Sequence, residues 1–239
     1  MREVNERDCI ILPGVCDAAG KLSIPDAFCA FMDQAAIHAQ ALGVGLYDLA
    51  KRDCFWLTVK TKVLFYRRPK MGEICRLITW PEAPQHLRCD RSYELRKGEE
   101  LLIAGKTEWA VLNTKTGALT PIEEIYPTDL TFDRPSALSE PYVRVADRFE
   151  PTDKYGEYRV RSTDIDVGGH VNNIAYVRAL LGSFSNAELK ELNVKKMDVV
   201  FRTSCYEGDL LELSRRKTDA GLDLRMAKDG KAAILAHME

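Results

Sequence analysis

The strongest constraint on the fold of this chain is a faint internal repeat. Residues 17–24 and residues 166–173 both begin with an aspartate, carry a glycine three positions later and an aliphatic side chain five positions later, and each is followed by a helical pattern. A second pair of blocks, residues 63–73 and 199–209, matches in the same order. Two matches in one order indicate a duplication, so we expect the chain to fold as two copies of one unit.

The periodicity within the copies is that of a mixed unit. Apolar side chains of residues 24–42 follow helical spacing, with Ser23 as a cap and Gly43 as a stop. Alternating apolar residues then predict strands. The predicted strands are residues 56–65, 73–80, 91–95 and 101–112, and the predicted helix of the second copy is 173–185. A helix followed by a meander of strands predicts an α+β fold with a mostly antiparallel sheet.

The boundary between the copies is marked by composition. At 239 residues the chain is long enough for two small domains. Both periodic patterns lapse after residue 124, where three prolines and two serines interrupt the sequence. We therefore predict an N-terminal domain over 1–124, a linker over 125–147 and a C-terminal domain over 148–239.

Charge and cysteine usage narrow the class of protein. A formal charge of −2 argues against nucleic acid as a bulk partner. Five of the first eight residues are charged, and no apolar run approaches the roughly 20 residues that span a bilayer, so we expect a cytoplasmic protein with no membrane partner. Seven cysteines without a Cys-x-x-Cys pair favour buried thiols over a disulfide framework or a zinc site. No motif for a cofactor or a metal is present, and we expect none.

One segment, residues 161–173, combines the groups that a catalytic site needs. It holds carboxylates, two glycines, a histidine and two amides immediately before a helix. Backbone amides at a helix start can hold the oxygen of a polarised carbonyl, while Asp166 and His170 could position or activate a water. A purely structural interpretation also fits, in which Asn172 or Asn173 caps the helix and Asp166 fixes the turn.

The same segment carries a family resemblance. Residues 164–173, Asp-Ile-Asp-Val-Gly-Gly-His-Val-Asn-Asn, resemble the motif Asp-x-Asn-x-His-Val-Asn-Asn of the acyl-ACP thioesterases. Residues 56–94 resemble the N-terminal half of that family. The matching positions there are Pro69, Gly72, Thr79-Trp80-Pro81 and Arg91. The resemblance implies a tandem double hot-dog, in which each half wraps a curved antiparallel sheet around a long helix. It also implies hydrolysis of the thioester between a fatty acyl chain and acyl carrier protein, in fatty acid biosynthesis.

The resemblance assigns roles residue by residue, with two departures. Asp166 and His170 match the catalytic positions, but Gly168 replaces the family's asparagine and Ser204 its glutamate, while Cys205 matches a cysteine of some members. We favour attack by a water that Asp166 activates over attack by Cys205 with His170 as its base. The remaining positions expected around the substrate in this half are Gly168, Gly169, Asn173 and Ser204.

The N-terminal copy has Lys21 in the place of His170. We therefore expect this half to be non-catalytic and to supply the pocket for the acyl chain. The predicted wall residues are Phe28, Phe31, Met32 and Trp56, and ordinary core packing explains them at least as well.

Several alternatives stay open at this level. An enzyme of the same fold could act on acyl-CoA, or dehydrate a carrier-bound chain, although dehydration needs a paired acid and base and only one convincing pair is visible. A degenerate relative could bind an acyl thioester without cleaving it, which the residues at 168 and 204 favour. Basic clusters at residues 67–70, 195–196 and 215–217 could meet an acidic carrier protein. The oligomeric state is open, a homodimer included.

Overall fold

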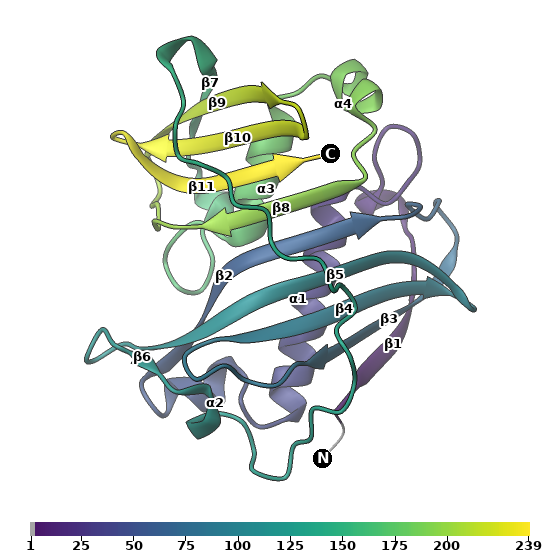
Figure 1. The fold of residues 1–239 in the computed structure, drawn as a ribbon, viewed down its shortest axis with the longest axis vertical. Helices are drawn as coiled ribbons and strands as arrows, with labels where there is room; N and C mark the ends of the chain where they lie inside the picture. The colour runs from purple at the N-terminus through teal and green to yellow at the C-terminus, as the bar shows by residue number, and fades with distance from the viewer. Residues whose placement is uncertain (1–2) are drawn as a thin grey trace. The chain divides into compact units, whose positions relative to one another are not determined.

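The computed structural model describes residues 3–239, which form two compact units. Unit 1 is Met1–Glu140 and unit 2 is Pro141–Glu239 (Figure 1). The division lies inside the segment 125–147 that the sequence predicts as a linker. Within the described residues no helix is both long enough and apolar enough to cross a membrane.

Unit 1 is one long helix and one antiparallel sheet. The helix α1 spans Ile24–Ala41, and the short helix α2 spans Leu46–Ala50. The strands are β1 (Asn5–Ile10), β2 (Cys54–Phe65), β3 (Ile74–Pro81), β4 (Cys89–Lys97), β5 (Glu100–Asn113) and β6 (Leu119–Thr120). The sheet order is β1-β3-β4-β5-β2, with β6 paired to β5.

Unit 2 repeats this topology. Its helices are α3 (Asn173–Gly182) and α4 (Asn186–Leu192). Its strands are β7 (Lys154–Arg159), β8 (Lys196–Phe201), β9 (Leu210–Thr218), β10 (Gly221–Lys228) and β11 (Lys231–Met238). The order β7-β9-β10-β11-β8 is antiparallel throughout and corresponds strand for strand to β1-β3-β4-β5-β2. The repeat read from the sequence is therefore a structural duplication, and the α+β class is confirmed.

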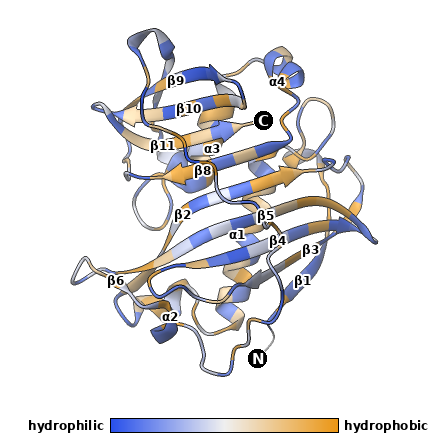
Figure 2. Cartoon of the chain, in the orientation of Figure 1, coloured by the Kyte–Doolittle hydropathy of each residue, from blue (hydrophilic) through white to orange (hydrophobic). Residues whose placement is uncertain are grey.

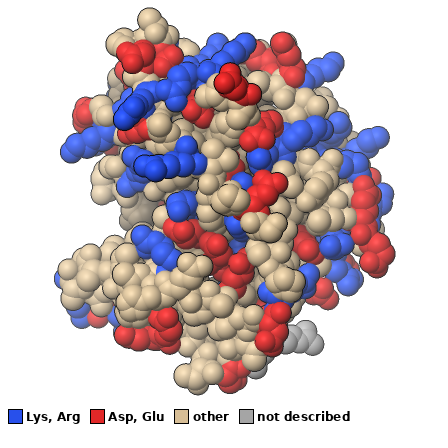
Figure 3. All heavy atoms as spheres, viewed as in Figure 1, with Lys and Arg blue, Asp and Glu red and all other residues tan. Residues whose placement is uncertain are grey.

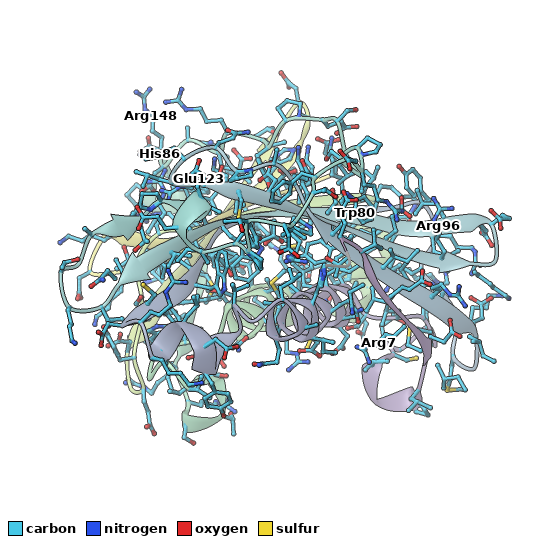
Figure 4. The ribbon with its side chains drawn as sticks, turned by 90° about the horizontal axis from the view of Figure 1, so that it is seen from below. Arg7, Trp80, His86, Arg96, Glu123 and Arg148 are labelled. Carbon is cyan, nitrogen blue, oxygen red and sulfur yellow. The ribbon has the colours of Figure 1, made fainter. Side chains whose placement is uncertain are left out.

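The sheet of unit 1 arches over α1, which Figure 4 shows nearly end-on beneath the strands. Phe31 of α1 is fully buried and stacks on Tyr93 of β4, with ring centroids 4.8 Å apart. Gly105 of β5 makes room for this stack, because a Cβ there would lie 2.6 Å from the Phe31 ring. Figure 2 shows hydrophobic and hydrophilic residues interleaved along the strands, as a sheet with one face on a helix requires.

The segment after β6 packs on unit 1 for much of its length. Ile125, Tyr126 and Leu130 are buried in a cluster with residues of α1 and β5. Farther along, the Trp80 indole donates a hydrogen bond to the carbonyl of Pro135 (3.1 Å). This part of the predicted linker is therefore an ordered covering of unit 1 rather than a solvated spacer.

Two local structures differ from the sequence-based expectation. The helix predicted over 173–185 ends at Gly182, and a second helix, α4, begins at Asn186. Ser185 caps α4, and its side chain and that of Glu188 form a reciprocal capping box.

The charged N-terminal segment, for which no strand was predicted, forms β1 at the edge of the sheet. Exposed charged side chains suit an edge strand because they discourage pairing with other chains.

Candidate active site

The segment with the expected catalytic residues is a tight hairpin in front of α3. The Asp166 amide donates to the carbonyl of His170 (3.0 Å), and the Gly169 amide donates to the carbonyl of Asp166 (3.0 Å). Gly169 has a φ of +77°, a conformation that favours glycine. The hairpin therefore brings the first and the last of these residues together by backbone bonds alone.

Within the hairpin the Asp166 and His170 side chains face each other. The Asp166 Oδ1 accepts a hydrogen bond from the Gly168 amide (2.8 Å) and lies 3.7 Å from the His170 Nδ1. That separation is too long for a hydrogen bond, so the two groups are neighbours rather than a bonded dyad. Their side chains are 28% and 26% exposed, respectively, which leaves both accessible to water and to a substrate.

Gly168 permits the position of the imidazole. A Cβ on Gly168 would lie 2.9 Å from the His170 Nε2 and 3.0 Å from the Asp166 Oδ1. The ring therefore occupies space that any larger residue at 168 would need. The observed position of the His170 ring is therefore compatible with glycine at 168, whereas the asparagine expected there would require the ring to move.

The start of α3 completes the hairpin. Asn172 is the cap, and its side chain accepts from the Ile174 amide (2.8 Å). Asn173 is the first helical residue, so its backbone amide belongs to the partially positive end of the helix. The structure thus gives Asn172 the capping role and leaves Asn173 beside the hairpin.

Cys205 and Ser204 lie on the loop next to this hairpin. The Val171 amide donates to the Cys205 carbonyl (2.9 Å), which fixes the loop against the hairpin. Ser204 is exposed, but Cys205 is fully buried. Burial raises the pKa of the Cys205 thiol, which favours the unreactive protonated form. Sequence reasoning missed Tyr176, a buried residue whose hydroxyl accepts from the Cys205 amide (3.0 Å).

Unit 1 contains the matching hairpin, but its aspartate is paired with an arginine. The Asp17 amide donates to the Lys21 carbonyl (2.8 Å), as in unit 2, but the Asp17 carboxylate is paired with Arg68, which occupies the position of Ser204. Burial acts to raise the pKa of Asp17, but hydrogen bonds from Arg68 and from backbone amides outweigh it and hold that pKa below its usual value. Arginine neutralises the aspartate of unit 1, whereas serine stands at that position in unit 2.

Unit 1 also contains an apolar cavity of about 190 Å³ between α1, α2 and the sheet. Met32 and Trp56, two of the four predicted wall residues, line it. Phe28 and Phe31 do not line this cavity and are buried in the core. The full lining is Met32, Ala35, Ala36, Ala39, Gly45, Leu46, Leu49, Phe55, Trp56, Arg91, Trp109 and Tyr126.

The basic clusters are partly neutralised by neighbours. Arg67 pairs with Glu73 (2.8 Å), and Arg215 pairs with Glu188 (3.0 Å). On the face drawn in Figure 3, Lys and Arg are interspersed with Asp and Glu.

Two solved structures share this fold over almost their whole length. An acyl-ACP thioesterase from Bacteroides thetaiotaomicron matches with a TM-score of 0.86 at 19% identity, covering 99% of this chain and 97% of that one. A 12:0-ACP thioesterase from Umbellularia californica matches with a TM-score of 0.86 at 18% identity, covering 100% and 97%. The fold is the tandem double hot-dog that the resemblance implies.

Sequence comparison supplies the family. Models of the N-terminal and C-terminal domains of acyl-ACP thioesterases match residues 3–128 and 150–237. The chain therefore belongs to the acyl-ACP thioesterase family. It is 24% identical over 201 residues to a chloroplastic acyl-[acyl-carrier-protein] hydrolase from Cuphea viscosissima, which covers 76% of this chain and 47% of that protein. A dodecanoyl-[acyl-carrier-protein] hydrolase from Cinnamomum camphora is 23% identical over 209 residues, covering 80% and 55%. The chain thus spans about half the length of the curated relatives it matches.

Proposed function

We propose that this protein hydrolyses fatty acyl thioesters of acyl carrier protein and thereby releases free fatty acids during fatty acid biosynthesis. The single observation that carries the proposal is the hairpin with Asp166 and His170 before α3, in a chain of the acyl-ACP thioesterase family. The relatives named above, acyl-ACP hydrolases by name, support the same substrate class.

In the proposed reaction a water attacks the thioester carbonyl carbon. The Asp166 carboxylate accepts a proton from the water as the new C–O bond forms. His170 and the backbone amide of Asn173 stabilise the negative charge that develops on the carbonyl oxygen. The tetrahedral intermediate then collapses, the C–S bond breaks, and the thiolate takes up the proton. The products are a carboxylic acid and the free thiol of the carrier.

Activated water is preferred to a cysteine nucleophile because of the surroundings of the Cys205 thiol. A nucleophilic cysteine needs a depressed pKa and access to the substrate. Cys205 is fully buried, and burial raises its thiol pKa. In this proposal Cys205 packs the loop beside the hairpin, and Ser204, Gly168 and Gly169 border the substrate.

In this proposal unit 1 binds the acyl chain of the substrate. Its own hairpin has Lys21 in place of a histidine and an aspartate that Arg68 neutralises. Its apolar cavity, with Met32 and Trp56 in the wall, suits a hydrocarbon chain.

One competing function has a specific observation in its favour. Gly168 and Ser204 lack the side chains expected at those positions, so the protein could bind acyl thioesters without cleaving them.

Acyl-CoA is the alternative thioester substrate, since the hairpin chemistry does not depend on the carrier.

The test is release of free thiol from matched acyl-ACP and acyl-CoA substrates of C8 to C18 by the purified protein. His170→Ala should abolish most of the release, whereas Lys21→Ala, the matched change in unit 1, should leave it intact. Faster release from acyl-ACP supports the proposed carrier. Acyl-ACP binding without thiol release would replace the proposal with the non-catalytic function.

A further inference from the structure

One buried charged residue belongs to the lining of the unit 1 cavity. Of the described residues that line the cavity, Arg91 on β4 is the charged one, and it is only 3% exposed. Leu46, which is 40% exposed, and the exposed Ala36 also line the cavity, so its wall runs from exposed to buried residues. The cavity wall therefore includes one buried arginine among residues that carry no charge.

Neutral groups hold this arginine in place. Its NH1 donates to the His38 Nδ1 (3.0 Å) and to the Thr79 Oγ1 (3.4 Å). A guanidinium is a donor only, so the His38 Nδ1 accepts and the imidazole carries no charge in this arrangement. The partners come from α1 and β3, and both are almost completely buried. Arg91 is thus fixed by well-ordered secondary structure on two sides.

The charge of Arg91 lacks an opposite charge nearby. Over residues 3–239 no carboxylate forms an ion pair with Arg91. Other arginines of the same sheet and its flanking loops, though more exposed, do have carboxylate partners. These are Arg67, Arg68, Arg76 and Arg96. A buried charge is unfavourable unless it is paired, so the cavity is electrostatically incomplete without an anion.

We propose that this cavity binds an alkyl chain whose far end carries a carboxylate, with Arg91 as the partner of that carboxylate. The apolar walls contact the methylene groups, and the guanidinium has five N–H donors, more than its neutral partners His38, Thr79 and Tyr126 accept. This inference rests on the proposed function, in which the ligand of the cavity is the acyl group of the thioester substrate. The preferred substrate class is then ω-carboxyacyl thioesters rather than acyl chains that end in a methyl group.

Binding can be measured without catalysis, since Trp56 and Trp109 line the cavity and report on it by fluorescence. The probes are octanoate and octylamine, which have the same chain length and opposite charges. Octanoate should change the tryptophan emission saturably at neutral pH, and octylamine should bind at least about tenfold more weakly. Equal binding of the two probes would overturn the proposal with the wild-type protein alone.

Two substitutions test the residue itself. Arg91→Leu should weaken octanoate binding about 10- to 100-fold, the range for a lost hydrogen bond to a charged group. Arg91→Lys keeps the charge and should retain most of the affinity, so it decides the matter if the leucine variant does not fold. The matched control is Arg96→Leu on the same strand, labelled in Figure 4, where Arg96 pairs with Glu94. Unchanged octanoate binding in folded Arg91→Leu would refute the assignment.

A paired hydrolysis assay separates this inference from the proposed function. Thiol release is compared for carrier-bound ω-carboxyacyl and methyl-ended chains of equal length. We expect the wild type to prefer the carboxyl-ended chain and Arg91→Leu to lose that preference. Arg91-dependent octanoate binding without any hydrolysis would sink the proposed function and keep the anion site. Hydrolysis without a preference for either chain, together with unchanged octanoate binding in Arg91→Leu, would refute the anion site and leave the proposed function intact.

Discussion

The hairpin geometry makes a sharp prediction for Gly168→Ala. The new Cβ would lie 2.9 Å from the His170 Nε2, whereas ordinary contact begins at 3.4 Å, so the imidazole must retreat by at least 0.5 Å. The backbone tolerates alanine because the φ of Gly168 lies outside the left-handed region. The ring is partly exposed and can move, so the free energy of unfolding should change by less than about 1 kcal/mol.

The cost should appear in catalysis instead. A misplacement of about 1 Å costs on the order of 100-fold in rate, so a shift of half that size should lower kcat/KM for acyl-ACP roughly 10-fold. The loss corresponds to about 1.4 kcal/mol of transition-state stabilisation. The assay is thiol release at limiting substrate, with Gly182→Ala as control, because a Cβ on that glycine of α3 meets nothing within 4 Å.

A double variant isolates the cause. In a His170→Ala background the added methyl group has no imidazole to displace but still meets the Asp166 Oδ1, at 3.0 Å, so Gly168→Ala should lower the residual rate by a smaller factor than it lowers the wild-type rate. Wild-type activity in Gly168→Ala would refute the reasoning. An equal or larger loss in the double variant would also refute it, because the effect would then pass through the Asp166 carboxylate rather than through His170.

Three other predictions concern the fold and the site. Gly105→Ala should lower the free energy of unfolding by about 1–3 kcal/mol in urea melts, because its Cβ would overlap the buried Phe31 ring; an unchanged midpoint would contradict the packing. Hydrogen bonds, chiefly from Arg67, lower the pKa of Glu73 from 4.5 to about 2. Because the folded pKa is depressed, this stabilisation is complete above pH 4.5 and is lost as the pH falls towards 2. Glu73→Gln should therefore cost about 1 kcal/mol at pH 7, after allowance for solvent screening, and progressively less below pH 4.5; a penalty that does not vary with pH would exclude the ion pair as its source. Cys205→Ala should keep most of the hydrolysis rate, and complete loss in a folded variant would favour the nucleophile mechanism.

Local patterns predicted the architecture well, and the reasons are visible in particular residues. The cap at Ser23 accepts from the Asp26 amide as expected, and the turn around Gly98 joins β4 to β5. The capping box at Ser185 and Glu188 is a sequence signal that could have separated α3 from α4. The strand β1 could not be read from its sequence, because an edge strand with charged side chains lacks clear alternation.

The candidate site was likewise predictable from the sequence only in part. The hairpin from Asp166 to His170 is contiguous in the chain, so a motif was sufficient to find it. Arg91 and His38 are 53 residues apart on different elements, and only the packing of β4 on α1 brings them together. Burial of Cys205 was equally beyond the sequence, because it depends on a loop held by the Val171 amide and on the Tyr176 hydroxyl.

The most direct test of the proposed mechanism is the rate of thiol release from acyl-ACP by wild-type protein and by Asp166→Asn. The substitution removes the base but keeps the size of the side chain and an oxygen able to accept from the Gly168 amide. We predict rapid release by the wild type and a loss of at least about 100-fold in the variant, the typical contribution of a general base. Full activity in Asp166→Asn would contradict activation of water at this carboxylate.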